Sequence, residues 1–302
     1  MTDVLIIGGG MAGMTAALYA ARAGLQVVLI EKEVCGGQAT TCGEIENYPT
    51  IKTITGADFS FNLYEQVTSY PIHIEYATVT QALLGGEIKV VAAGDERLEA
   101  KTVIIAGGVK RRELGCEGEK EFTGRGVSYC AVCDGNFFKG KQVAVVGGGN
   151  TALEDALYLS RICEKVTLIH RRDFFRAEPV LIERVLHTDT IHIVYNSQVT
   201  KIEGDNRVNS ITLKTENDTN SKIAVDAVFI AVGMIPDNGL YANELPLDKS
   251  GYFQVGEDCM TPVKGVYVAG DCRSKEYRQL ITAGADGAVA ALQAARYLTQ
   301  QS

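Results

Sequence analysis

The chain has 302 residues, of which 46% are hydrophobic and 22% charged, a composition that excludes a mostly disordered protein and allows about two domains. Its formal net charge of −8 lacks the basic footprint that a nucleic-acid-binding protein needs. The chain has eight cysteines but only one Cys-x-x-Cys, a spacing that excludes a disulfide framework. Because no secretion signal is recognisable, we expect a cytoplasmic protein.

The first residues predict a strand, a tight turn and a helix. Residues 4–21 carry no charge over about the minimum length of a membrane span, but a β-branched run followed by three glycines favours strand, turn and helix instead. Gly8, Gly10 and Gly13 have the spacing that lets a backbone turn and a helix N-terminus approach a pyrophosphate. Glu31 ends the next strand, where a carboxylate accepts hydrogen bonds from ribose hydroxyls and repels a 2′-phosphate. This site is expected to bind FAD or NAD, the alternative being a glycine-rich structural turn.

Alternating apolar and polar residues follow in residues 72–100, and again in residues 191–225. Such alternation, broken by turn residues, predicts two antiparallel meanders. The predicted turns lie at 85–86, 204–206 and 216–220, and apolar strands that end in glycine lie at 102–108, 227–233 and 265–271. A helix rich in small residues is expected over roughly 283–298.

The opening unit is repeated in the middle of the chain, with a strand, three glycines, an Ala/Leu-rich helix and a second strand. The same number of positions separates Gly10 from Glu31 and Gly149 from His170. Two such βαβ units predict an α/β fold with two Rossmann-like, three-layer ββα nucleotide-binding domains, the second inserted in the first. We expect an FAD-binding domain from residues 1–114 and 239–302, and an NADPH-binding domain carrying the Cys-x-x-Cys from residues 115–238.

The second glycine turn carries the opposite charge. Gly147 and Gly149 keep the spacing, with an alanine at the third place, which the pattern permits. At the position of Glu31 stands His170, and a cationic cluster continues through Arg171, Arg172 and Arg176. Guanidinium groups bind phosphate oxygens bidentately, so this cluster predicts an NADPH site that reads the 2′-phosphate. A solvated basic turn is the alternative.

Cys130 and Cys133 form the one Cys-x-x-Cys of the chain. A zinc site needs four ligands, and the sequence offers no second pair at this spacing. A structural disulfide would close only a short loop and would not persist in a reducing cytosol. A redox pair fits best, because a Cys-x-x-Cys lowers the pKa of one thiol, whose thiolate attacks a disulfide that the second thiol resolves. Asp134 is then expected to act as a general acid–base, with a turn cap as the alternative.

The chain resembles the low-molecular-weight thioredoxin reductases over essentially its whole length. The resemblance is carried by GGGMAG at 8–13, GGQATT at 36–41, IENYP at 45–49, GRGVSYCAVCDG at 124–135, GGGNTALEDALYLS at 147–160, HRRDFFRAE at 170–178 and GDCRSKEYRQLITAGADG at 270–287. It implies an NADPH-dependent thioredoxin-disulfide reductase that contains FAD and acts on thioredoxin or a thioredoxin-like protein. It also implies a homodimer and a large rotation of the second domain during the reaction. From the charge, the cysteine spacing and the glycine-interrupted N-terminal run we expect no nucleic-acid, metal or membrane partner.

The resemblance also assigns roles to single residues. Cys130 would attack the thioredoxin disulfide, Cys133 would lie against the flavin, and Asp134 would move the proton. The implied FAD-binding residues are Gly8, Gly10, Met11, Ala12, Gly13, Glu31, Gly37, Gln38, Asn47, Gly270, Asp271, Arg278 and Gln279. The implied NADPH-binding residues are Gly147, Gly149, Asn150, Thr151, His170, Arg171, Arg172 and Arg176. The sequence departs from the family pattern at Thr50, Gly107 and Met234, which puts local flavin contacts in question.

Three other functions remain as alternatives. A dithiol oxidase that uses oxygen and a thioredoxin reductase fed by ferredoxin share the scaffold, but both have less need of the basic cluster at 170–176. A non-catalytic nucleotide sensor would bind the same dinucleotides without moving electrons to the cysteines.

Overall fold

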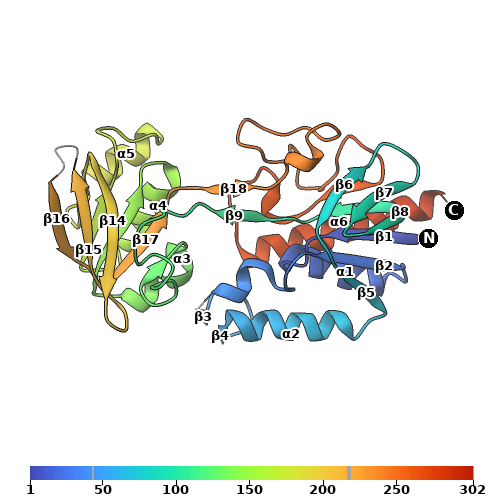
Figure 1. The fold of residues 1–302 in the computed structure, drawn as a ribbon, viewed down its shortest axis with the longest axis horizontal. Coiled ribbons are helices and arrows are strands. Elements are labelled where there is room, and N and C mark those ends of the chain that lie inside the picture. The colour runs from blue at the N-terminus through green and yellow to red at the C-terminus, as the bar shows by residue number, and fades with distance from the viewer. Residues whose placement is uncertain (43, 216–218, 302) are drawn as a thin grey trace. The chain divides into compact units, whose positions relative to one another are not determined.

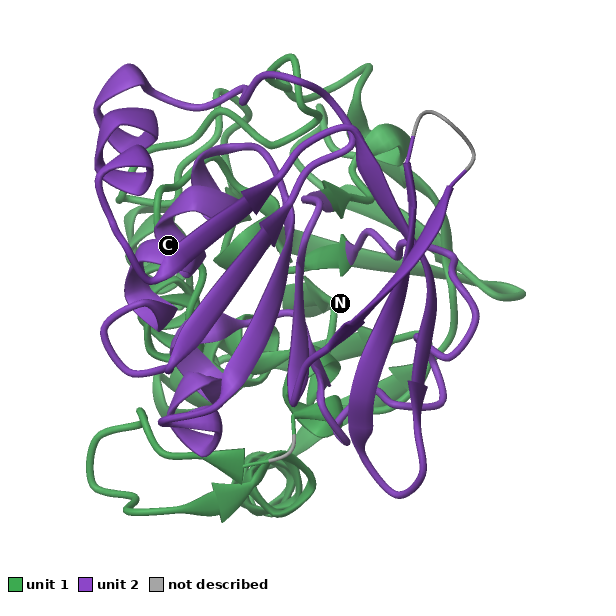
Figure 2. Ribbon diagram, turned by 90° about the vertical axis from the view of Figure 1, so that its left-hand side faces the viewer, with its two compact units in different colours: residues 1–110, 235–302 green, residues 111–234 purple. Residues whose placement is uncertain are grey.

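The computed structural model describes residues 1–42, 44–215 and 219–301. It divides into two compact units, which Figure 2 colours separately: unit 1, Met1–Lys110 with Ile235–Ser302, and unit 2, Arg111–Met234. The chain passes between them twice, through β9 (Val109–Arg111) and β18 (Met234–Pro236), which pair as a two-stranded ribbon. The domain limits expected at 114 and 238 lie a few residues beyond these passages.

Unit 1 is built on a mixed sheet whose parallel part surrounds the N-terminal strand (Figure 1). Val4 of that strand pairs in parallel with Val27 on one side and Thr102 on the other. The described strands follow the order β5-β2-β1-β8-β7-β6, and β19 pairs with the C-terminal part of β8. Their bounds are β1 Thr2–Ile7, β2 Val27–Glu31, β5 Ile72–Tyr76, β6 Val79–Leu83, β7 Lys89–Ala93, β8 Glu96–Ile105 and β19 Val266–Val268. A separate two-stranded pair is formed by β3 (Glu44–Ile45) and β4 (Ile54–Thr55).

Alternate side chains of β1 belong to two different cores. Val4 and Ile6 pack with residues of the helices, whereas Leu5 and Ile7 pack with residues of the β6–β8 meander. Successive side chains of a strand point to opposite faces, so β1 is buried on both sides and unit 1 has three layers. The helices of unit 1 are α1 (Met11–Arg22), α2 (Gly56–Thr68) and α6 (Leu280–Gln301), with short 3₁₀ turns at Gly37–Thr41, Gly239–Tyr241 and Gly270–Cys272.

The final helix, α6, is slightly longer at both ends than the expected 283–298 and packs closely on α1. A side chain at Gly287 would collide with the backbone of Ala12, so this glycine permits the close approach of the two helices. Residues 4–21 are divided between β1 and α1, and no described helix is both long and apolar enough to cross a membrane.

Unit 2 repeats this plan. Val143 pairs with Val166 at the same offset in sequence that joins Val4 to Val27. The parallel sheet has the order β10-β17-β11-β12-β13, and a three-stranded antiparallel sheet has the order β14-β15-β16. The strands are β10 Val127–Ser128, β11 Gln142–Gly147, β12 Lys165–Ile169, β13 Ile191–Val194, β14 Ser197–Gly204, β15 Val208–Thr215, β16 Asn220–Ala224 and β17 Ala227–Ala231. The helices are α3 Ala131–Asp134, α4 Asn150–Leu159 and α5 Pro179–Leu186, with a 3₁₀ turn at Gly135–Phe138.

The central strand β11 again separates two cores. Val143 and Val145 pack with residues of α4 and α5, while Ala144 and Val146 pack with residues of the antiparallel sheet. This arrangement of parallel sheet, helices and antiparallel sheet in both units confirms the predicted α/β fold with three-layer domains.

Two strands that the alternation assigned to antiparallel meanders are instead part of the parallel sheets. β5 pairs in parallel with β2, and β13 pairs in parallel with β12. The prediction of antiparallel meanders over all of 72–100 and 191–225 is therefore wrong for the first strand of each and holds for β6–β8 and β14–β16. Alternation identifies a half-buried strand but not the strand it pairs with. The turn predicted at 204–206 lies between β14 and β15, and positions 216–218 of the turn predicted at 216–220 lie outside the described residues.

Thr50 adopts a left-handed backbone conformation, with φ at +75°, and its side chain is exposed. A β-branched residue is strained in that region because its Cβ crowds the backbone. This is one of the positions at which the sequence departs from the family pattern, so the departure carries a conformational cost.

Replacing Thr50 with glycine is expected to raise the free energy of unfolding by about 1 kcal/mol. The backbone strain energy that is removed from the folded state is larger than the free energy by which the extra entropy of glycine stabilises the unfolded chain. Chemical denaturation of the two proteins measures the difference. Thr53→Gly is the matched control, since Thr53 is exposed in the same loop and is not among the residues with positive φ. That variant should be destabilised, and destabilisation of both variants would show that Thr50 is not strained.

Candidate active site

The two cysteines of the Cys-x-x-Cys motif form a disulfide in unit 2. Their Cα atoms lie 5.3 Å apart, on either side of the start of α3. Cys130 caps this short helix, and its sulfur accepts a hydrogen bond of 3.2 Å from the backbone N–H of Cys133. Both residues are half-buried, and the intervening Val132 is 46% exposed. The sulfurs therefore lie close enough to the surface for disulfide exchange, and a backbone donor is in place to stabilise a thiolate on Cys130.

Asp134 follows directly on the same helix. Its Oδ2 accepts a hydrogen bond of 2.5 Å from the hydroxyl of Ser128, which also accepts from the backbone N–H of Cys130. Burial raises the pKa of the Asp134 carboxyl, and this outweighs the lowering by the Ser128 hydrogen bond and by the charge of Arg111. A carboxyl with a raised pKa keeps its proton to higher pH and can donate it to a departing thiolate.

The glycine turn of unit 1 has the close contacts that its spacing predicts. Gly8 has φ at +107°, and a side chain there would collide with the backbone of Ala106. A side chain at Gly13 would collide with the carbonyl of Gly8, so α1 can start this near to β1 only with glycine at that place. Around Gly10 the nearest atom to an added Cβ is 3.9 Å away, on Gly37. The space beside Gly10 therefore suits the approach of a pyrophosphate to the backbone. Met11, Ala12 and Gly13 form the first turn of α1.

Glu31 lies at the end of β2 and is held by the same turn. Its Oε2 accepts a hydrogen bond of 2.6 Å from the backbone N–H of Gly9, and its Oε1 accepts one from Glu33. The carboxylate is thereby fixed at the edge of the sheet, where a ribose would lie.

The other residues implied for the flavin come from three separate segments of unit 1. Gln38 donates to the carbonyl of Val109 at 2.6 Å, and Asn47 donates to the side chain of Gln279 at 3.2 Å. Arg278 donates to the carbonyl of Asp271 at 3.4 Å. Gly37 opens a 3₁₀ turn, and Gly270, with φ at +81°, opens another. The fold thus brings Asn47 to Gln279, which are far apart in the sequence, and Asp271 to Arg278, which lie in the same segment.

The glycine turn of unit 2 is closed by the segment that carries the arginines. The backbone N–H of Arg176 donates to the carbonyl of Gly148 at 2.7 Å. The Asn150 side chain donates to Glu178 at 3.0 Å, and the backbone N–H of Glu178 donates back to it at 2.9 Å. Gly147 ends β11, Gly149 caps α4, and Thr151 lies exposed on its first turn. These bonds place Arg176 beside the turn that would hold the pyrophosphate.

His170 differs from the arginines that follow it. It is 8% exposed, stacks on Phe175 with ring centroids 5.6 Å apart, and lies so close to Gly148 that a side chain there would collide with its ring. Burial lowers its pKa, and the charges of Arg172 and Arg171 lower it further. The imidazole is therefore neutral at pH 7, so the positive charge of the cluster comes from the arginines. Arg171 is exposed and Arg172 half-exposed.

Three buried side-chain polar atoms have no hydrogen-bond partner among the described residues: Ser60 Oγ, His170 Nε2 and Asp271 Oδ1. Buried polar atoms normally find a partner, so such an atom indicates that another group binds there. Two of the three belong to residues implied for the cofactors, one in each unit. Both nucleotide sites thus fit their cofactors: around Gly10 and around Gly149 the nearest atom to an added Cβ is 3.9 Å away, and each unit has a buried polar atom without a hydrogen-bond partner among the described residues.

A cluster of buried charges beside Asp271 was not anticipated from the sequence. Arg273 binds Asp286 at 2.8 Å, and Lys275 binds the same carboxylate at 3.0 Å. These charges lie within the GDCRSKEYRQLITAGADG segment at 270–287, but the segment by itself does not indicate that they pair with one another in the interior. Only the packing of α6 against the Gly270–Cys272 turn brings them together.

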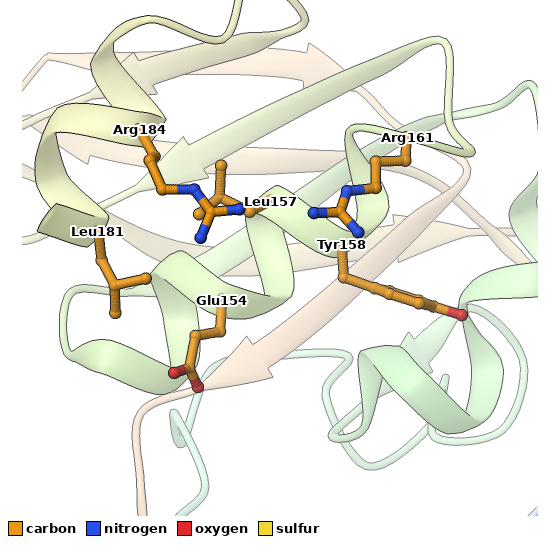
Figure 3. A pocket seen from close by; sticks show the side chains of 6 residues that line it. All are labelled: Glu154, Leu157, Tyr158, Arg161, Leu181 and Arg184. Carbon is orange, nitrogen blue, oxygen red and sulfur yellow. The ribbon is translucent and has the colours of Figure 1, made fainter.

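A pocket of 220 Å³ lies between α4 and α5 of unit 2 (Figure 3). Its lining residues are Glu154, Leu157, Tyr158, Arg161, Leu181 and Arg184. None of them is a predicted site residue. Within the described part of the chain, no group of three or more His, Cys, Asp or Glu side chains could hold a metal ion.

Comparison with known proteins agrees with this geometry. The pyridine nucleotide-disulphide oxidoreductase family matches residues 2–287. The chain is 41% identical to a thioredoxin reductase of Bacillus subtilis (strain 168) over 300 residues, which are 99% of this chain and 95% of the relative. Its structure resembles the crystal structure of thioredoxin reductase from Streptococcus pyogenes MGAS5005, with a TM-score of 0.95 at 41% identity over 99% of both chains. A thioredoxin reductase from Giardia duodenalis gives a TM-score of 0.94 at 35% identity, again over 99% of both chains.

These similarities confirm the resemblance that the sequence motifs indicate, and the two nucleotide-binding domains. The chain therefore belongs to the pyridine nucleotide-disulphide oxidoreductase family.

Proposed function

We propose that this protein uses NADPH to reduce the disulfide of thioredoxin or a thioredoxin-like protein, through FAD and the Cys130–Cys133 pair. The observation that carries the proposal is the half-buried disulfide at the start of α3, next to a carboxyl whose pKa is raised by burial. The curated relatives named thioredoxin reductase, at 41% identity over nearly the whole chain, support the same reaction.

Bound FAD would supply the two-electron chemistry between a hydride donor and the disulfide. Two electrons and two protons convert Cys130–Cys133 to the dithiol. The Cys130 thiolate then attacks the disulfide of thioredoxin or the thioredoxin-like protein. It forms a mixed disulfide with one sulfur of that disulfide and releases the other as a thiolate. Cys133 attacks the Cys130 sulfur, restores the disulfide of this chain and releases the second thiolate. Asp134 accepts the proton that a thiol of the reduced pair loses when it becomes the attacking thiolate, and donates a proton to a departing thiolate of thioredoxin.

The flavin is proposed to lie in unit 1. The pyrophosphate would approach Gly8, Gly10 and Gly13 at the N-terminus of α1, beside Met11 and Ala12. Glu31 would accept bonds from the ribose. Asp271, which follows Gly270, would accept one from a hydroxyl of the ribityl chain through its Oδ1, which has no hydrogen-bond partner among the described residues. The remaining contacts are assigned to Gly37, Gln38, Asn47, Arg278 and Gln279.

The NADPH is proposed to lie in unit 2. Its pyrophosphate would approach Gly147 and Gly149 at the N-terminus of α4, next to Asn150 and Thr151. His170 Nε2, buried and without a partner among the described residues, is available to a ribose hydroxyl. The 2′-phosphate would bind Arg171, Arg172 and Arg176.

Three wider features belong to the same proposal. The protein acts in the cytoplasm, where a dithiol pair stays reducible. It works as a homodimer, as the family resemblance implies. The two strands β9 and β18, as the passages between the units, would act as the hinge for a domain rotation.

Anaerobic titration of the purified protein tests the function. A yellow protein whose flavin absorbance bleaches with NADPH, far less readily with NADH, and recovers on addition of oxidised thioredoxin would support the proposal. Recovery with oxygen alone would instead indicate a dithiol oxidase, and bleaching only with reduced ferredoxin would indicate the ferredoxin-linked reductase. A colourless protein that binds nucleotide without redox change would indicate a sensor.

Replacing Arg171 and Arg172 together with alanine is expected to raise the KM for NADPH by about 30-fold, because two charge-assisted contacts to the 2′-phosphate are lost at a partly exposed site. The KM for NADH should stay within about twofold, since that nucleotide lacks the phosphate. Steady-state kinetics with both nucleotides measure the two values.

The matched control is Arg161→Ala with Arg184→Ala, which removes two arginines of the same unit that line the pocket in Figure 3. This control should leave both KM values unchanged. An equal rise for NADPH and NADH in the Arg171/Arg172 variant would show that these arginines do not read the 2′-phosphate.

A further inference from the structure

Unit 1 contains a buried cluster of charges, the Asp286 cluster, formed by Arg273, Lys275 and Asp286. Their side chains are only 3%, 5% and 6% exposed. Arg273 donates to both oxygens of Asp286, at 2.8 and 2.9 Å, and Lys275 donates to its Oδ2 at 3.0 Å. One carboxylate of α6 therefore binds two cations of the segment that follows β19.

The same carboxylate also shapes the turn that carries Asp271. The backbone N–H of Gly270 donates to Asp286 Oδ2 at 3.0 Å. Gly270 has φ at +81°, and Asp271 is the next residue. Asp286 thus fixes the backbone immediately before the residue proposed to bind the ribityl chain.

Lys275 lies between two carboxylates and forms a hydrogen bond with only one of them, Asp286. Its ammonium is 3.0 Å from Asp286 Oδ2 and 3.9 Å from Asp271 Oδ1. The longer distance is beyond a hydrogen bond, and Asp271 Oδ1 has no hydrogen-bond partner among the described residues. A movement of about one ångström would bring the ammonium within bonding distance of Asp271.

We propose that Asp286 is a positioning residue that holds Lys275 away from Asp271 and so keeps Asp271 Oδ1 available to a hydroxyl of the bound flavin. This inference rests on the proposed function, which assigns Asp271 to the ribityl chain. Without the charge of Asp286, Lys275 has one buried carboxylate left to pair with, and that is Asp271. The ammonium then occupies the oxygen that the flavin needs, because a buried cation must be paired.

A purely structural role for Asp286 makes a different prediction. Asp286 also binds Arg273, so its loss disturbs the turn whether or not Lys275 moves. In that case removing the ammonium of Lys275 would not restore flavin binding. Removing the Lys275 ammonium in the Asp286 variant therefore distinguishes the two roles of Asp286: positioning of Lys275, and structural support of the turn.

The experiment measures the dissociation constant of FAD, from the fluorescence of flavin released when the holoenzyme is diluted. Asp286→Asn is expected to weaken FAD binding by about tenfold, the value of one hydrogen bond to a charged group. Asp286→Asn with Lys275→Met should return to within about threefold of the unchanged protein, because the competing ammonium is gone. Asp286→Asn with Lys249→Met is the control; Lys249 is exposed in the same unit, and its removal should restore nothing.

Lys275→Met alone covers the case in which Asp286→Asn does not fold. It is expected to bind FAD at least as tightly as the unchanged protein, since it removes only the competitor. Weakening by more than about threefold in this variant, or no recovery in the double variant, would overturn the inference while leaving the proposed function intact. Failure of the unchanged protein to bind FAD would overturn the proposed function, and this inference with it.

Discussion

Replacing Cys133 with serine is expected to abolish reduction of thioredoxin, by about 10⁴-fold or more, as loss of a reacting nucleophile does. A serine hydroxyl forms no disulfide, so the Cys130–Cys133 pair could no longer hold two electrons, and a mixed disulfide on Cys130 could not be resolved. Reduction of the flavin by NADPH should continue, because no sulfur takes part in the hydride transfer. Anaerobic absorbance spectroscopy follows the flavin, and an assay of thioredoxin thiols follows the overall reaction.

Cys116→Ser is the matched control for this prediction. Cys116 lies in unit 2 and forms no disulfide with any described residue, and burial raises the pKa of its thiol to about 11. A thiol with that pKa is protonated at pH 7 and does not attack disulfides. Its variant should keep full turnover. Unchanged turnover in Cys133→Ser would refute the assignment of the redox pair.

Replacing Asp134 with asparagine is expected to slow thioredoxin reduction by about 10²-fold at neutral pH, the lower end of what a general acid contributes. The pH dependence should change as well. Burial raises the pKa of Asp134, more than Ser128 and Arg111 lower it. The carboxyl is the protonated donor below that pKa and loses the proton above it, so the rate should fall as pH rises through it. Asparagine carries no such proton, and the alkaline fall assigned to Asp134 should disappear.

Two further variants test this assignment. Ser128→Ala removes a hydrogen bond that favours the charged carboxylate, so the alkaline fall should shift to higher pH. Asp189→Asn changes an exposed aspartate of the same unit and should leave the profile unchanged. Stopped-flow measurement of the exchange step over a range of pH gives all three profiles. A profile of unchanged shape in Asp134→Asn would mean that another group supplies the proton.

Much of the fold was predictable because its signals are local in the sequence. The β1–α1–β2 and β11–α4–β12 units each occupy one short continuous stretch of the chain. In both units the glycine spacing after an apolar run predicts a strand, a turn and a helix in that order. The pairing of β5 with β2 and of β13 with β12 was not predictable in this way. Both strands show the alternation of a meander, and only the finished sheet selects their neighbours.

Some features of the candidate site were likewise predictable from short stretches of sequence, and others depend on tertiary contacts. Cys130, Cys133 and Asp134 are adjacent in sequence, so their chemistry could be proposed before their positions were known. The neutral state of His170 could not be predicted from the sequence, because it depends on burial of the imidazole against Gly148 and Phe175. The left-handed conformation of Thr50 was likewise invisible, since threonine gives no signal for it.

The sequence by itself determined that two dinucleotide sites of opposite charge accompany one dithiol, because glycine spacing, the end of a strand and a Cys-x-x-Cys are all short-range features. The tertiary structure decided which polar atoms remain available at those sites. Asp271 Oδ1 keeps no hydrogen-bond partner among the described residues because Asp286, on helix α6, binds Lys275 at 3.0 Å and leaves its ammonium 3.9 Å from Asp271. Such an outcome depends on distances from Lys275 to two carboxylates that differ by about one ångström, and only the packed fold sets those distances.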